Sequence, residues 1–145
     1  MSEPSEVVHK SIISFLLKNW NISTYISVEN WLKQTGQNYF IDFRAMLVVM
    51  MINYLYLYLA VGSIYVLTGS RYNLSLQMIA LLVVFTLVYT VVRTRKQLLV
   101  NRSEYLEWRK YHPVMASGQV WIKLFIGMVV LVLIKQMNKN ILIVQ

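Results

Sequence analysis

Cysteine is absent from this 145-residue chain, and histidine occurs only twice, as His9 and His112. The absence of cysteine excludes disulfide bonds, thiolate catalysis, iron–sulfur clusters and cysteine zinc sites. Neither histidine lies inside an apolar run, so a haem held between two membrane histidines is not expected. These absences predict a protein that has no metal, no cofactor and no enzymatic activity.

Acidic residues are also scarce, with six Asp and Glu against 14 Lys and Arg, which gives a net charge of +8. A glycine-rich phosphate loop and a nucleic-acid-binding motif are both missing, so nucleic acid is not an expected partner. Basic residues close to a membrane exit are typical of the cytoplasmic or matrix side, where they meet anionic lipid headgroups. The basic residues expected to do so are Arg93, Arg95, Lys96, Arg102, Arg109 and Lys110.

Two long runs, residues 45–67 and 74–92, contain no charged side chain. Helices of these lengths would reach roughly 35 and 28 Å, against a hydrocarbon core of about 30 Å. Because a backbone in lipid must satisfy its hydrogen bonds internally, the runs predict two helices joined by a tight turn. The expected fold class is an all-α integral membrane protein with a transmembrane helical hairpin at residues 45–92.

The segment before the hairpin, residues 1–44, is expected to be peripheral, amphipathic and aromatic. Apolar residues recur at helical spacing over residues 5–20, which predicts an amphipathic helix in the membrane interface or against a partner protein. Gly36 is expected to separate a short helix at residues 28–33 from the start of the first membrane helix. An aromatic belt at the membrane boundary is expected from Tyr39, Phe40 and Phe43.

The chain after the hairpin is expected to form a basic juxtamembrane helix over residues 93–113, ended by Pro113. Residues 114–145 are expected to hold a third transmembrane helix, or a re-entrant one, and a tail. The apolar core of this region lies between Lys123 and Lys135. We expect the Lys123 side chain to snorkel to the interface, with a functional role as the alternative.

Polar side chains decorate the first membrane helix. Asn53 lies near its middle, and an unpaired amide in hydrocarbon costs several kcal/mol, so it needs a partner in the hairpin or in a neighbouring subunit. Tyr54, Tyr58 and Tyr65 fall close to one helix face. Gly62 belongs to a patch of small residues that would allow another helix to approach closely. All five residues are expected to pack against protein.

Two segments resemble the prenylated Rab acceptor family. Residues 39–43, Tyr-Phe-Ile-Asp-Phe, are similar to the Phe-x-x-Asn-Tyr motif that precedes the first membrane helix of that family. Residues 93–100, which begin with Arg93 and end in Gln-Leu-Leu-Val, are similar to the family's loop after its second helix. The resemblance implies two transmembrane hairpins and a role in ER–Golgi trafficking. A second hairpin is not visible after Pro113, where the remaining chain is short and carries Lys123 and Lys135.

Two functions follow from these features as hypotheses. The polar membrane helix, the peripheral segments and the lack of a cluster suited to chemistry favour a non-catalytic accessory subunit of a larger membrane complex. Its expected partners are other membrane-protein subunits and anionic lipids. The mitochondrial inner membrane is preferred to the ER or Golgi as its location. The alternative is a membrane-trafficking or membrane-shaping protein of the ER and Golgi.

Overall fold

The computed structural model describes residues 12–69 and 75–144, and the regular structure within these ranges is entirely helical. Three helices are long and apolar enough to cross a membrane: α4 (Ile41–Leu67), α5 (Leu76–Val100) and the Gln119–Asn140 part of α8 (Gln119–Val144). The shorter helices are α2 (Ile12–Lys18), α3 (Trp20–Gln34), α6 (Arg102–Tyr111) and α7 (Pro113–Ser117). The protein is an all-α integral membrane protein, as the sequence predicts.

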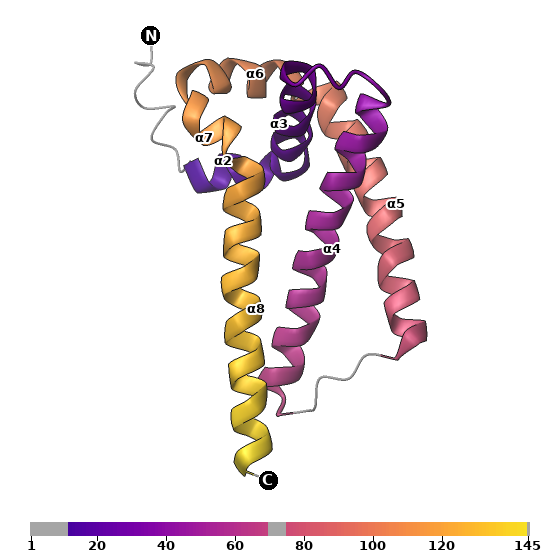
Figure 1. Ribbon diagram of the computed structural model, residues 1–145, viewed down its shortest axis with the longest axis vertical. Coiled ribbons are helices and arrows are strands. Elements are labelled where there is room, and N and C mark those ends of the chain that lie inside the picture. The colour runs from indigo at the N-terminus through magenta and orange to yellow at the C-terminus, as the bar shows by residue number, and fades with distance from the viewer. Residues whose placement is uncertain (1–11, 70–74, 145) are drawn as a thin grey trace.

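The membrane helices extend from a head in which α2, α3, α6 and α7 gather at one end of the molecule (Figure 1). Helix α4 packs against both α5 and α8 and lies between them. Away from the head, α4 and α5 spread apart in the view of Figure 1. The segments before and after the hairpin therefore meet at the same end of the molecule. The expected hairpin turn, the first half of the expected amphipathic helix and His9 lie wholly or partly outside the described residues.

Helix α3 corrects the prediction of a short helix at residues 28–33. The helix runs from Trp20 to Gln34, and its side chains form the centre of the head. Ile22, Tyr25 and Leu32 are buried there beside residues of α4 and α6. Gly36, with a φ of +71°, follows the helix and lets the chain reverse toward α4, so the expected break at this glycine is confirmed.

Close packing joins α8 to α4. A Cβ atom added to Gly127 would lie 2.8 Å from Leu55 Cδ2, so a larger residue there would force the Leu55 side chain to shift. Farther from the head, Leu59 and Val66 of α4 form a buried cluster with Ile134 of α8. The third membrane helix is therefore fastened along its length to the first helix of the hairpin.

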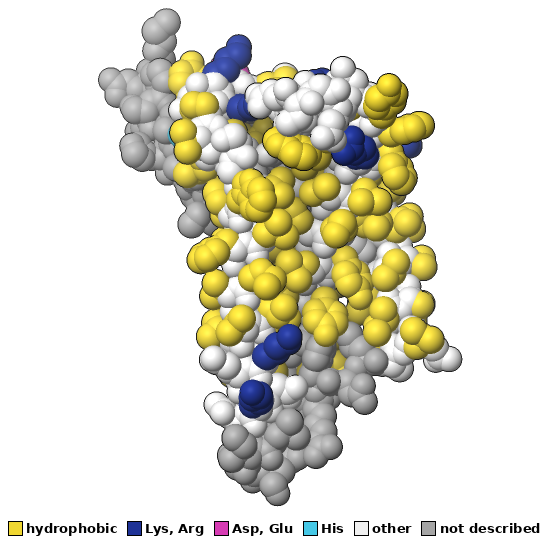
Figure 2. All heavy atoms as spheres, in the orientation of Figure 1, with side chains coloured by type: hydrophobic (Ala, Val, Ile, Leu, Met, Phe, Trp, Pro, Cys, Tyr) yellow, Lys and Arg dark blue, Asp and Glu magenta, His cyan; other side chains and the backbone are white. Residues whose placement is uncertain are grey.

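The outer surface of the membrane region is apolar. Figure 2 shows hydrophobic side chains covering this face of the membrane helices, with Lys and Arg side chains toward both ends. At the end of α8 away from the head, Lys135 and Lys139 are exposed. An apolar band between charged ends is the pattern expected of helices that cross a bilayer.

Tyr105 of α6 is fully buried in the head, and its hydroxyl has no hydrogen-bond partner among the described residues. A buried hydroxyl without a partner costs about 1–3 kcal/mol, so Tyr105→Phe should raise the free energy of unfolding by about 1 kcal/mol. Thermal unfolding of the purified protein in mild detergent measures this change. Exposed Tyr111 in the same helix provides the control, and Tyr111→Phe should have no effect.

The burial of Tyr105 predicts that the protein loses stability at alkaline pH. Burial raises the pKa of Tyr105 from 10.0 to about 12. The phenol ionises at a lower pH in the unfolded chain than in the folded chain. Its ionisation therefore leaves the free energy of unfolding unchanged below pH 10 and lowers that free energy as the pH rises toward 12. The difference in melting temperature between pH 9 and pH 11 should therefore shrink in Tyr105→Phe. An unchanged difference would contradict the assignment of a buried neutral phenol.

Candidate functional site

The polar side chains at the start of α3 meet all three membrane helices in one buried cluster, which we call the polar junction. Its members are Trp20, Asn21, Ser23 and Thr24 of α3, Asn53 of α4, Thr90 and Gln97 of α5, and Lys123 of α8. All of them except Trp20 are buried. The junction lies where the head joins the membrane region, so its hydrogen bonds fix how the two parts sit against each other.

Gln97 bridges the bend between α2 and α3. Its Nε2 donates to the Lys18 carbonyl at 2.9 Å, and its Oε1 accepts from the Ile22 N–H at 3.0 Å. In a continuous helix, these two backbone groups would bond to each other. A side chain inserted into the helical hydrogen-bond ladder is a known cause of a sharp bend. Helix α5 thus holds the bend at Asn19 by satisfying backbone groups of another helix.

Asn53 uses all the hydrogen-bonding capacity of its amide inside the chain. Its Oδ1 accepts from Trp20 Nε1 at 2.9 Å. Its Nδ2 donates to Asn21 Oδ1 at 3.1 Å and to Thr90 Oγ1 at 3.0 Å. Of the two alternatives for this amide, the structure places its partners in the hairpin and in α3. A neighbouring subunit is not needed to satisfy Asn53.

Lys123 does not snorkel, and the sequence-based expectation is wrong. Only 3% of the residue is exposed, and its Nζ donates to the Trp20 carbonyl at 2.8 Å, Ser23 Oγ at 2.8 Å and Thr24 Oγ1 at 2.7 Å. The ammonium also lies 4.3 Å from the centroid of the Trp20 ring. Because α3 supplies three oxygen atoms within reach, all three N–H donors are satisfied without contact with water.

The charge of Lys123 is stabilised by dipoles rather than by a carboxylate. The ion pairs found among the described residues join Lys18 to Glu104, and both Lys33 and Arg102 to Glu29. None of these pairs involves Lys123. An ammonium held only by hydroxyl groups, a carbonyl and an aromatic ring is satisfied in geometry but expensive to bury.

Tyr56 borders the polar junction, although the packing residues expected from the sequence were its neighbours Tyr54 and Tyr58. Its hydroxyl donates to the Lys123 carbonyl at 2.8 Å, and its ring meets Trp20 edge-on at 4.9 Å between centroids. Tyr56 and Gln97 were both missed by sequence reasoning. A signal for Gln97 was present, because Thr86, Thr90 and Thr94 precede it at helical spacing on one face of α5.

The other expected packing residues of α4 lie away from the junction. Tyr54 and Tyr58 are each two residues from Tyr56, which places them on the opposite face of the helix, and Tyr65 falls on that face as well. All three are half-buried, and the rings of Tyr54 and Tyr58 are 6.4 Å apart. Gly62 is buried within the chain. Their expected role in contacting a partner remains a prediction.

The basic residues expected to face lipid headgroups are divided between two helices rather than placed on one. Helix α5 continues to Val100, and Asn101 separates it from α6. Those on α5 are Arg93, Arg95 and Lys96, which are all exposed. Those on α6 are Arg102 and Lys110, which are exposed, and Arg109, which is half-buried.

Within the described ranges, 12–69 and 75–144, the structure contains no group of three His, Cys, Asp or Glu side chains that could hold a metal ion. The donors of Lys123 and Asn53, and one donor of Gln97, are occupied by groups of the chain itself. The junction is therefore arranged to hold helices together. No model of a known protein family, no curated protein and no solved structure matches the chain, so the resemblance to the prenylated Rab acceptor family rests on residues 39–43 and 93–100 alone.

Proposed function

We propose that this protein is a non-catalytic accessory subunit of a larger membrane complex and contributes to the assembly or stability of that complex. The observation that carries the proposal is the uncovered surface of the membrane helices. Within the chain, only 11% of the apolar window of α5 and 17% of that of α8 are buried. Meanwhile the polar junction holds the head firmly on these helices. Such a chain offers long apolar surfaces at fixed positions to neighbouring subunits.

The face of α4 that carries three tyrosines is our candidate for a contact with another subunit. We call the half-buried residues Tyr54, Tyr58 and Tyr65 the tyrosine face. In transmembrane helix packing, a polar group gains on average about 0.6 kcal/mol from a partner on a neighbouring helix. The rings are only half-buried, so part of each phenol is left to pack against a membrane helix of a second subunit.

Extraction of the tagged protein in mild detergent tests both parts of the proposal. The wild-type protein should migrate at a native mass many times that of a single chain. A triple variant with phenylalanine at Tyr54, Tyr58 and Tyr65 should shift toward the small species, because three hydroxyls at about 0.6 kcal/mol each weaken association roughly 20-fold. Tyr89→Phe, at an exposed site on α5, serves as the control. A wild-type protein that migrates as one or two chains would refute the subunit role.

We place the complex in the mitochondrial inner membrane in preference to the ER or Golgi. The head gathers exposed basic side chains at one end of the molecule, which suits the anionic matrix-facing leaflet. The second candidate function is a membrane-trafficking or membrane-shaping protein of the ER and Golgi. It is favoured by the similarity at residues 39–43 and by the bulky head at one end of the membrane helices. A small native species located in the ER or Golgi would support this alternative.

A further inference from the structure

A pocket of about 300 Å³ lies where the head meets the membrane region, apart from the polar junction. Its walls come from α3, α4, α6, the end of α7 and the start of α8. The side chains that determine its chemistry are Asn30, Trp31, Val48, Arg109, Val120 and Trp121. This volume is at the lower end of the range of about 300–1,000 Å³ that is typical of ligand pockets.

Two hydrogen-bond donors in the pocket wall lack partners among the described residues. Arg109 is half-buried and belongs to none of the ion pairs found there. The Nδ2 atom of Asn30 is buried and makes no hydrogen bond. No carboxylate lines the pocket. A guanidinium group and an amide donor without an acidic neighbour favour a ligand that carries an anionic group, such as a phosphate.

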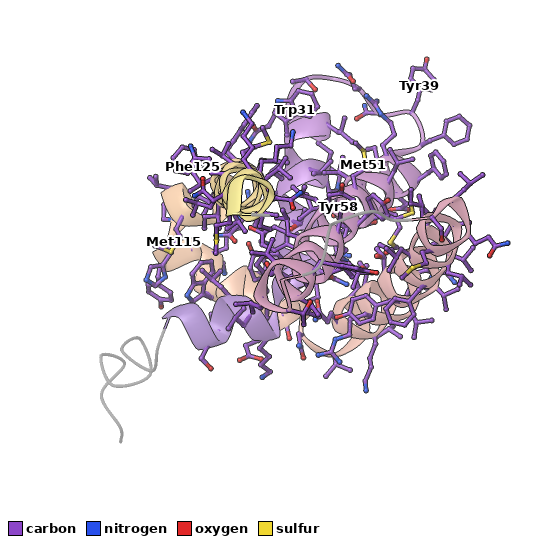
Figure 3. All side chains as sticks on the ribbon, turned by 90° about the horizontal axis from the view of Figure 1, so that it is seen from below. Trp31, Tyr39, Met51, Tyr58, Met115 and Phe125 are labelled. Carbon is purple, nitrogen blue, oxygen red and sulfur yellow. The ribbon has the colours of Figure 1, made fainter. Side chains whose placement is uncertain are left out.

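The rim of the pocket has the composition of a membrane–water interface. Trp31 and Trp121 are 56% and 75% exposed, and tryptophan concentrates at headgroup level. Below the rim, Met51 of α4 and Phe125 of α8 are exposed and extend the apolar surface toward the bilayer centre. Figure 3 shows Trp31 in the upper part of the view, with Phe125 on one side of it and Met51 on the other. An apolar chain attached to a phosphate in the pocket would have a surface to lie against.

We propose that this pocket binds the headgroup of an anionic phospholipid, with the phosphate paired to Arg109 and its acyl chains on the apolar surface below. Asn30 Nδ2 supplies a second donor. Among the basic residues of the head, Arg109 then differs from exposed neighbours such as Lys110, which attract anionic lipids only through diffuse charge. This inference stands independently of the proposed subunit role, because a lipid site can form in an isolated chain.

The tryptophans on the rim allow a direct test in reconstituted vesicles. Phosphatidylglycerol with brominated acyl chains should quench the tryptophan fluorescence of the wild-type protein more strongly than brominated phosphatidylcholine at the same mole fraction. Because the guanidinium loses a charge-assisted hydrogen bond to the phosphate, Arg109→Gln should weaken this preference about ten-fold. Lys110→Gln changes the net charge equally and should retain the preference. Asn30→Leu should reduce it without any change in charge.

Several outcomes would overturn the proposal. Equal losses in Arg109→Gln and Lys110→Gln would mean diffuse attraction, and equal quenching by the two lipids would mean that the site does not select anionic headgroups. Displacement of the lipid by inorganic phosphate alone would indicate a site for a free anion. Crosslinking of a photoreactive residue at Trp31 to a polypeptide, with no effect of Arg109→Gln on lipid preference, would indicate a protein partner. Circular dichroism checks that each variant is folded. If Arg109→Gln does not fold, Asn30→Leu tests the site instead.

Discussion

Replacing Gln97 by leucine should lower the free energy of unfolding by about 2–4 kcal/mol, because one buried and one partly buried backbone group lose their partners at roughly 1–3 kcal/mol each. The Ile22 N–H and the Lys18 carbonyl both bond to the Gln97 amide. Leucine fills similar space but neither donates nor accepts. The bend between α2 and α3 must then close into a straight helix, which would move α2, or remain with unpaired groups.

Denaturation of the protein in mixed detergent micelles, followed by circular dichroism, measures the effect of Gln97→Leu. Gln77→Leu is the matched control, since Gln77 is exposed on the same helix and should tolerate the change. Gln97→Glu keeps an acceptor for the Ile22 N–H but sets a carboxylate against the Lys18 carbonyl. It should therefore not rescue the protein. Wild-type stability in Gln97→Leu would show that the amide bridge does not hold the bend.

Lys123→Glu should destabilise the protein by about 4 kcal/mol or more, the range seen when a buried charge loses its compensation. The three oxygen atoms around the Lys123 ammonium would then face a carboxylate instead. The Trp20 carbonyl cannot donate. Although the hydroxyls of Ser23 and Thr24 can rotate, they would have to give up their own bonds to that carbonyl. Few of the hydrogen bonds that surround the Lys123 ammonium can therefore form around a glutamate.

Lys123→Met distinguishes the effect of the charge on stability from the effect of side-chain packing. Methionine fills most of the space, loses the hydrogen bonds and removes the cost of a buried ammonium, so its stability should stay within about 2 kcal/mol of wild type. Lys135→Glu, on the exposed side of the same helix, should change stability by less than about 0.5 kcal/mol. Equal behaviour of Lys123→Glu and Lys135→Glu in the unfolding assay would mean that residue 123 reaches water in the membrane.

The membrane helices could be predicted because each is a long run without charge, and lipid leaves a helix as the only satisfied conformation. Helix α3 could not be predicted in the same way. Asn21, Ser23 and Thr24 are polar, yet they are buried because their partners come from α4 and α8. Hydrophobic periodicity detects helices that bury an apolar stripe. It does not detect a helix whose buried face is built from hydrogen bonds.

The behaviour of Lys123 depended on a contact that no local pattern encodes. From the sequence, a lysine near the end of an apolar run reaches the interface most easily by snorkelling. In the folded chain, the first turn of α3 is closer than water and presents hydroxyl and carbonyl oxygens from residues about a hundred positions earlier. Asn53 was more predictable, because an amide at mid-membrane requires partners wherever they come from.

The bridge made by Gln97 has a consequence for the order of biogenesis. The α2–α3 segment leaves the ribosome before the membrane helices, but its bend is completed by a residue 75 positions later and its first turn by Lys123, about a hundred positions later. Until α5 and α8 are inserted, the polar face of α3 can bond to Asn53 of α4 but not to Gln97 or Lys123. This early segment is thus among the last to be fixed in place, and a ribosome stalled before α8 would present an α3 helix without its contacts to Lys123.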